Sequence, residues 1–289
     1  SSQISNVGKA IAMYTNEYKD FYPTVASISD DSWVYCGGQY DTVADLDSNA
    51  GTETRWWDTT WDATDWANTP TIGGCLYLLC RYGDVAPKNY LCPSCKTFRS
   101  MDEDIREKMG TTTIVSYKDC MDFSSMESCN YSYQNPLKLP TATSESGLAV
   151  YADKNWCCDY GDGSNIWNDK AVQGGVQPYW GAAAASLTNT NDFIEAAICT
   201  DDDDSSVDFT NRHQNSKNHD TDTQNVLFAG YNVERCDKPF VGISNDNIYT
   251  IWFSAAATPM QKIRGEWGSG KMTWAKLNAA NEKDSVLGN

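Results

Sequence analysis

The first twenty residues of the chain carry apolar side chains at intervals of three and four positions. The members of this stripe are Ile4, Val7, Ile11, Tyr14 and Tyr18. This spacing places all five on one face of an α-helix, while Lys9 and Glu17 fall on other faces. We expect the helix to end near Asp20, because Pro23 disfavours helical backbone in the residue before it. Such a helix needs a second element on which to bury its stripe.

Cysteine is the second constraint, since the 289 residues include 11 of them. This density is typical of a disulfide-stabilised protein from an oxidising compartment. Near neighbours in the sequence indicate three pairs: Cys75/Cys80, Cys92/Cys95 and Cys120/Cys129. Metal binding is the alternative for these thiols, and it is disfavoured because no second CxxC accompanies Cys92-Pro-Ser-Cys95. The full connectivity stays open.

The charge balance narrows the classes of partner. The chain has 39 acidic and 22 basic residues, a formal net charge of −17. A field of this sign repels phosphate backbones and anionic lipid surfaces, so nucleic-acid binding is not expected. Only two histidines are present, which limits histidine-based catalysis.

The remaining pattern alternates short helices with strands. Residues 71–85 predict a buried helix that ends at Gly83, and residues 102–109 a short charged helix or turn. Strands are expected at 129–136, 147–153 and 248–254. Residues 225–234 predict a hairpin with Val226 and Phe228 on one face and Leu227 on the other. Because Ala229 disfavours positive φ, we expect a type II′ turn with Gly230 first. The fold class is therefore α+β.

Two further features suggest binding. Residues 28–70 are rich in tryptophan, and rings such as Trp57 beside carboxylates suit sugar stacking; a cover over a small core is the favoured alternative. Oxygen ligands on acidic loops are candidate calcium ligands, with ordinary solvated turns as the alternative. These calcium candidates are Asp159, Asp162, Asn165, Asp201 and Asp203.

Several stretches, in order, resemble bacterial type IV pilin-like proteins and the related pseudopilins of type II secretion. They are residues 1–23, "YLCPSC" at 90–95, "NRH" at 211–213 followed by "NVLFAGYNVE" at 225–234, and "GISNDNIYTIW" at 242–252. The chain departs from the family pattern at Ala229, where the signature has Asp, and by an insertion at 214–224. These matches cover about a quarter of the chain.

The resemblance implies a pilin-like fold, with the helix of residues 1–22 packed on an antiparallel β-sheet. The head, 23–289, would carry a Trp/Cys-rich insertion at about 28–70, a hairpin region at about 225–254 and loop-rich, disulfide-stapled insertions. An apolar half-helix upstream of Ser1 would enter the membrane and then the filament core. The implied function is structural and not enzymatic. The chain would be an extracellular, self-assembling filament subunit at the cell surface, with calcium as the candidate cofactor.

Two alternatives belong to other classes. A surface protein that binds or processes carbohydrate would use the tryptophan-rich insertion. A hydrolase would be centred on His213 or His219. The hydrolase is disfavoured because no GxSxG motif is present and the cysteines are expected to be oxidised.

Overall fold

A computed structural model of the chain describes the residues on which the following account rests. They are residues 2–24, 72–95, 99–109, 114–124, 128–134, 144–154, 216–219 and 222–249, with 283, 285, 287 and 288. The insertion at 28–70, the five calcium candidates and His213 lie outside these ranges.

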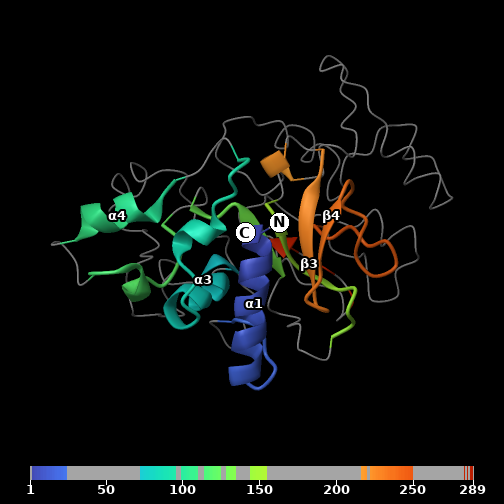
Figure 1. Cartoon of the computed structure of the whole chain (residues 1–289), viewed down its shortest axis with the longest axis horizontal. Coiled ribbons are helices and arrows are strands. Elements are labelled where there is room, and N and C mark those ends of the chain that lie inside the picture. Colours follow the sequence, from blue (N-terminus) through green and yellow to red (C-terminus); the bar gives the residue numbers. More distant parts are fainter. Residues whose placement is uncertain are drawn as a thin grey trace, which may run out of the picture.

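An antiparallel sheet forms the centre of the described structure (Figure 1). Its strand order is β4-β3-β2-β1-β5. The strands are β1 (Tyr131–Gln134), β2 (Ala149–Asp153), β3 (Gln224–Phe228), β4 (Val233–Cys236) and the short β5 (Leu287–Gly288). Every pairing is antiparallel, and a register irregularity interrupts β2 opposite β3. Helices accompany this sheet, so the chain is α+β, as the sequence predicts.

Helix α1 (Ser2–Glu17) packs on the sheet at β3. A Cβ atom built on Gly8 would lie 3.0 Å from Cδ1 of Leu227, so the helix backbone packs closely against this side chain of β3. Two polar contacts fix the helix at its ends. The Tyr131 hydroxyl donates to Gln3 Oε1 at 2.8 Å, and the hydroxyl oxygens of Thr15 and Tyr231 are 3.0 Å apart. The predicted helix is confirmed, with its end at Glu17.

Helix α3 (Ile72–Tyr82) is buried along almost its whole length and lies beside α1. Its Tyr77 ring meets Phe123 edge-on with centroids 5.0 Å apart, and Phe123 meets Tyr90 at the same distance. Tyr90 ends the short 3-10 helix η2 (Pro87–Tyr90). Large rings therefore fill the core between the helices and the sheet, because each buries a large rigid apolar area.

Two further helices are short. Helix α4 (Met101–Lys108) begins at Ser100, whose side chain accepts the N–H of Asp102, and it confirms the predicted charged helix. The 3-10 helix η3 (Tyr117–Asp119) is closed by a capping box between Ser116 and Asp119. Lys118 of η3 pairs with Asp84, which follows α3. The exposed Lys118–Asp84 pair thus links η3 to the residues that follow α3.

The β3–β4 hairpin confirms the predicted faces but not the predicted turn. Leu227 belongs to the core cluster shared with α1, whereas Val226 and Phe228 belong to a smaller cluster on the opposite face. The residue with positive φ is Tyr231, at 61°, and its N–H donates to Phe228 O at 2.8 Å. The Phe228 N–H donates to Asn232 O at 3.0 Å, so the two strands are connected by the three residues 229–231, closed by a left-handed residue rather than by a type II′ turn.

One other expectation can be compared with the structure at the edge of the described ranges. The predicted strand at 248–254 is wrong where it can be examined, because Ile248 and Tyr249 lie in a turn. An isolated bridge between Phe240 and Asn247 precedes that turn. Among the helices described, none has the length and apolar character needed to cross a membrane.

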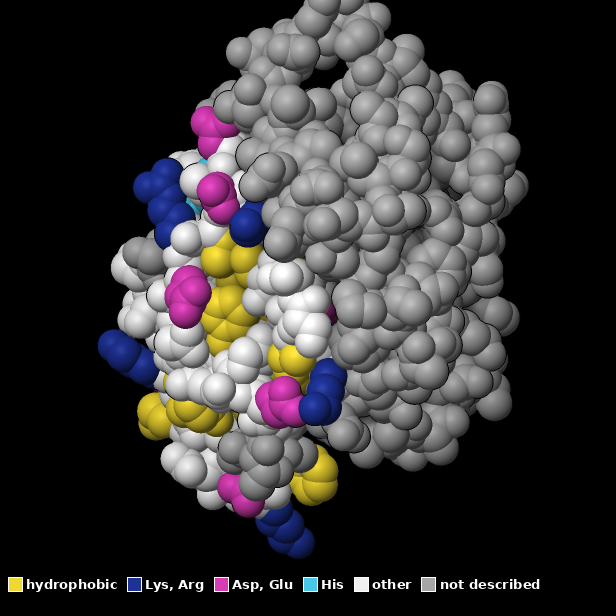
Figure 2. All heavy atoms as spheres, turned by 90° about the vertical axis from the view of Figure 1, so that its right-hand side faces the viewer, with side chains coloured by type: hydrophobic (Ala, Val, Ile, Leu, Met, Phe, Trp, Pro, Cys, Tyr) yellow, Lys and Arg dark blue, Asp and Glu magenta, His cyan; other side chains and the backbone are white. Residues whose placement is uncertain are grey.

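Figure 2 shows one side of the molecule at atomic detail. In its described part, basic and acidic side chains are interspersed around a hydrophobic area. Acidic side chains thus do not form a continuous patch on this part of the surface, although the formal net charge is −17.

Candidate functional site

The stripe expected to drive assembly is divided between the interior and the surface. Ile4, Val7 and Ile11 are buried against the chain's own sheet. Tyr14 is half-buried and stacks on Tyr18, with ring centroids 4.2 Å apart. Three of the five residues are thus buried against other parts of the same chain. The surface that α1 offers to another molecule consists of other residues, of which Met13 is the most exposed large apolar one.

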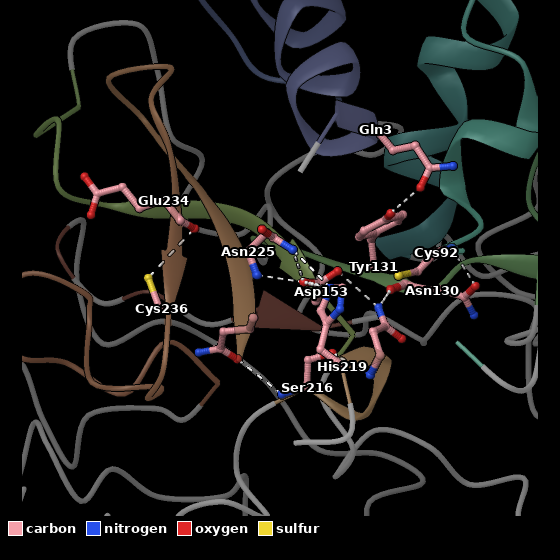
Figure 3. A network of polar contacts seen from close by, with 12 residues as sticks. Gln3, Cys92, Asn130, Tyr131, Asp153, Ser216, His219, Asn225, Glu234 and Cys236 are labelled. Atoms are coloured by element: carbon pink, nitrogen blue, oxygen red, sulfur yellow. Dashed lines mark hydrogen bonds and ion pairs between the residues drawn. The ribbon is translucent and has the colours of Figure 1, made fainter. Parts of the chain in front are cut away.

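A second group of side chains meets at the end of the sheet (Figure 3). It consists of Cys92, Asp153 and His219, and one ligand atom from each lies within 4.8 Å of the others. Cys92 is in the turn after η2, Asp153 is the last residue of β2, and His219 is the last residue of the 3-10 helix η8 (Lys217–His219). Three segments distant in the sequence therefore converge on one point.

Asn130 holds two of these segments together. Its side-chain oxygen accepts the backbone N–H of Cys92 at 2.9 Å. Its backbone oxygen accepts the Asn218 side-chain amide at 2.6 Å, which fixes η8. Asn130 immediately precedes β1, whose Tyr131 pairs with Asp153 in the sheet register. The sheet thus supplies a rigid base, and one asparagine aligns the cysteine turn and the histidine helix over it.

Donors surround the Asp153 carboxylate. Its Oδ2 accepts the backbone N–H of Asn225 at 2.6 Å and the Asn225 side-chain amide at 2.9 Å. The same oxygen lies 3.1 Å from His219 Nε2. Its Oδ1 accepts from Asn218 Nδ2 at 3.2 Å. Both oxygens of this buried carboxylate therefore have hydrogen-bond donors, as a buried polar group requires.

His219 is electrostatically coupled to both of its neighbours. The pKa of His219 is raised from 6.5 to about 10. The largest cause is the hydrogen bond to Asp153 and the second is a hydrogen bond with Cys92, while burial of the ring opposes the increase. The same Nε2 lies 3.0 Å from the Asn225 side-chain nitrogen. A protonated Nε2 donates to Asp153, whereas a bare Nε2 accepts from Asn225. The ring nitrogen therefore has a hydrogen-bond partner in either protonation state.

Solvent access limits the chemistry that this group can perform. Cys92 and Asp153 are buried, while the side chain of His219 is 24% exposed. A thiol beside an imidazole and a carboxylate has the composition of a nucleophilic triad. That reading requires a substrate to reach Sγ, and Cys92 is only 3% exposed. Thiolate, imidazole and carboxylate are also ligands of zinc, and the ligands of a structural zinc site need no access for a substrate.

The predicted disulfides are not formed between the described cysteines. Cys75, Cys80, Cys92, Cys95, Cys120 and Cys129 all carry thiols in the structure. The Cys75/Cys80 pair is wrong for a geometric reason, since both lie on α3 five positions apart. An ideal helix separates such Cα atoms by about 8–9 Å, beyond the roughly 7 Å that a disulfide spans. Cys80 instead has Cys129 and Cys120 nearby. Burial is the main cause that raises the pKa of Cys80, and these two neighbours raise it further.

The sequence indicated parts of the site but not the whole. Asp153 was expected at the end of a buried strand, and His219 was a candidate histidine. Cys92 was assigned to a disulfide with Cys95. In the structure both lie in one turn, which is closed by a hydrogen bond from Cys95 N–H to Cys92 O at 3.0 Å. His219 belongs to the insertion at 214–224, which the resemblance treated as a departure. Only the fold brings the three together.

Comparisons of the chain with protein-family models, with curated proteins and with solved structures gave no match.

Proposed function

We propose that the chain is a structural subunit of an extracellular pilus-like or pseudopilus filament. It acts by self-assembly at the cell surface, not by catalysis. The proposal rests first on the resemblance of residues 1–23 and 211–252 to pilin-like proteins. The structural observation that supports it is an N-terminal helix packed along one face on an antiparallel sheet, with large apolar side chains still exposed around its C-terminal end.

Those exposed side chains are Met13, Tyr18 and Phe21, with exposed fractions of 70%, 39% and 45%. Exposed apolar residues scattered singly are normal, but a group of them at one end of an element marks a contact surface more often. Packing this end of α1 against a neighbouring subunit would remove that apolar surface from water. The buried stripe would meanwhile keep each helix fixed to its own head.

The test compares two matched double variants of the full-length protein, produced in the organism that makes it. The first is Met13→Glu with Phe21→Glu. The control is Val115→Glu with Met109→Glu, at residues that are 74% and 47% exposed and lie outside α1. Burying two carboxylates in an interface without partners is strongly unfavourable. We therefore expect the first variant to fold but not to form filaments in electron micrographs, while the control assembles normally.

Thermal melts of both purified variants establish that they are folded. Filaments formed equally well by the two variants would contradict the role of α1 in assembly. A wild-type protein that is found only as a monomer would contradict the filament itself.

A further inference from the structure

We propose that Cys92, Asp153 and His219 form a binding site for one zinc ion, with thiolate, carboxylate and imidazole as ligands. This site is independent of the filament proposal, because it depends only on the convergence of the three side chains at the end of the sheet (Figure 3).

The donor set selects the class of metal. Calcium and magnesium take oxygen ligands, so a sulfur and a nitrogen in a set of three argue against them. Zinc binds cysteine sulfur at about 2.3 Å, histidine nitrogen at about 2.0–2.1 Å and carboxylate oxygen at about 2.0–2.2 Å. Ligand atoms around such an ion lie about 3–4 Å apart. The separations within the group, all under 4.8 Å, need only small side-chain rotations to reach this geometry.

The surroundings match a prepared site. Zinc ligands are oriented by hydrogen bonds from neighbouring groups, and loss of such a neighbour weakens metal affinity about 10- to 100-fold. Here Asn225 holds Asp153 through two hydrogen bonds, and Asn218 contacts Asp153 Oδ1 while it joins η8 to Asn130. Oδ1 accepts one of these hydrogen bonds and Oδ2 accepts two, so we assign Oδ1 as the oxygen that would bind the ion. Exposure at His219 gives the ion a route from solvent.

Bound zinc would also have a structural effect. Its three ligands come from the turn after η2, the end of β2 and η8. One ion would therefore bind together three segments that are also joined by hydrogen bonds of Asn130 and Asn218. Because an ion that binds only the folded state stabilises it by mass action, zinc should raise the melting temperature of the wild-type protein.

The experiment titrates the full-length protein, as isolated and without added reductant, with cobalt(II) and then with zinc. Cobalt(II) reports on its own ligands, since a thiolate gives a charge-transfer absorption band and a tetrahedral site gives intense visible bands. We expect both signals at one cobalt per chain, and their loss when zinc displaces the cobalt. Metal analysis after dialysis should then give one zinc per chain.

Variants assign the signals to residues. Cys92→Ser should abolish the thiolate band, whereas Cys236→Ser, which changes another buried cysteine, on β4, that is not one of the three ligands, should leave it intact. Asn218→Ala should weaken zinc binding about 10- to 100-fold and retain the band. Should Cys92→Ser fail to fold, the wild-type spectrum still decides the matter.

Three results would overturn the proposal. The first is a wild-type cobalt spectrum without a thiolate band. The second is a Cys92–Cys95 disulfide in the isolated protein, found by peptide mapping under non-reducing conditions. The third is zinc binding of equal affinity in wild type and in folded Cys92→Ser.

Discussion

Tyr231 shows how one residue can be held in a conformation that its side chain disfavours. Its φ of 61° lies in the left-handed region, which costs a non-glycine residue roughly 1–2 kcal/mol. Two contacts oppose this cost. Its hydroxyl lies 3.0 Å from Thr15 Oγ1, and its ring lies 6.3 Å from that of Tyr22. The turn conformation is therefore maintained by helix α1 and the residues after it.

This arrangement makes a prediction from two substitutions at the same position. Tyr231→Ala removes the ring and keeps the unfavourable φ, whereas Tyr231→Gly removes the ring and relieves the backbone. Both variants should be less stable than wild type, and the glycine variant should be more stable than the alanine variant by about 1 kcal/mol. Urea unfolding measures the difference. Equal stability, or a more stable alanine variant, would show that the turn carries no backbone strain.

The same residue explains why the turn could not be predicted. Local rules assign positive φ to glycine, so Gly230 was the natural choice in Ala229-Gly230-Tyr231. The contacts that favour Tyr231 instead come from Thr15 and Tyr22, which are more than two hundred positions earlier in the sequence. Cys92 was misassigned for a similar reason, because its nearest cysteine in sequence was Cys95 while its partners in space are Asp153 and His219.

At the scale of the element, the short helix η3 depends on one charged group. The Asp119 carboxylate accepts the backbone N–H groups of Val115 and Ser116 at 3.0 and 2.8 Å. The hydrogen bond from Val115 is the largest cause that lowers the pKa of Asp119 below 3.8. A carboxyl group with a lowered pKa stabilises the fold above pH 3.8, and this contribution is lost as the pH falls through the folded-state value.

Asp119→Ala should accordingly be less stable than wild type at pH 7. We expect a difference of about 1 kcal/mol, small because the carboxylate is partly exposed to solvent. The difference should shrink as the pH is lowered below 3.8, because the wild-type carboxyl group becomes protonated. Urea unfolding of both proteins at several pH values tests this. A difference that does not change with pH would mean that packing, and not the charge, is what Asp119 contributes.

Elements with strong local patterns were predictable from the sequence. The three-four spacing of Ile4, Val7 and Ile11 gave α1, and the alternation of Val226, Leu227 and Phe228 gave both faces of β3. The run at 248–254 looked similar to a strand, yet Ile248 and Tyr249 lie in a turn. Ile248 there donates its N–H to Pro239 O and accepts from Leu287 N–H, so contacts outside the run decide its conformation.

On the scale of the whole molecule, α1 and the sheet form a continuous core. Ile11 is fully buried in it, whereas Met13, on the same helix, is 70% exposed. If α1 belongs to the cooperative unit, Ile11→Ala should lower the free energy of unfolding by about 2–5 kcal/mol. Met13→Ala should change it by no more than about 0.5 kcal/mol. Urea unfolding followed by circular dichroism measures both, and a negligible effect of Ile11→Ala would show that α1 unfolds separately from the sheet.

The packing of Gly8 against Leu227 also has a consequence for synthesis. A ribosome adds about 5–20 residues per second, so the 219 positions from residue 8 to residue 227 take about 10–45 s to translate. Throughout that interval the apolar face of the nascent helix has no β3 strand against which to pack. A chaperone that shields this segment until translation reaches the hairpin would therefore raise the yield of native protein.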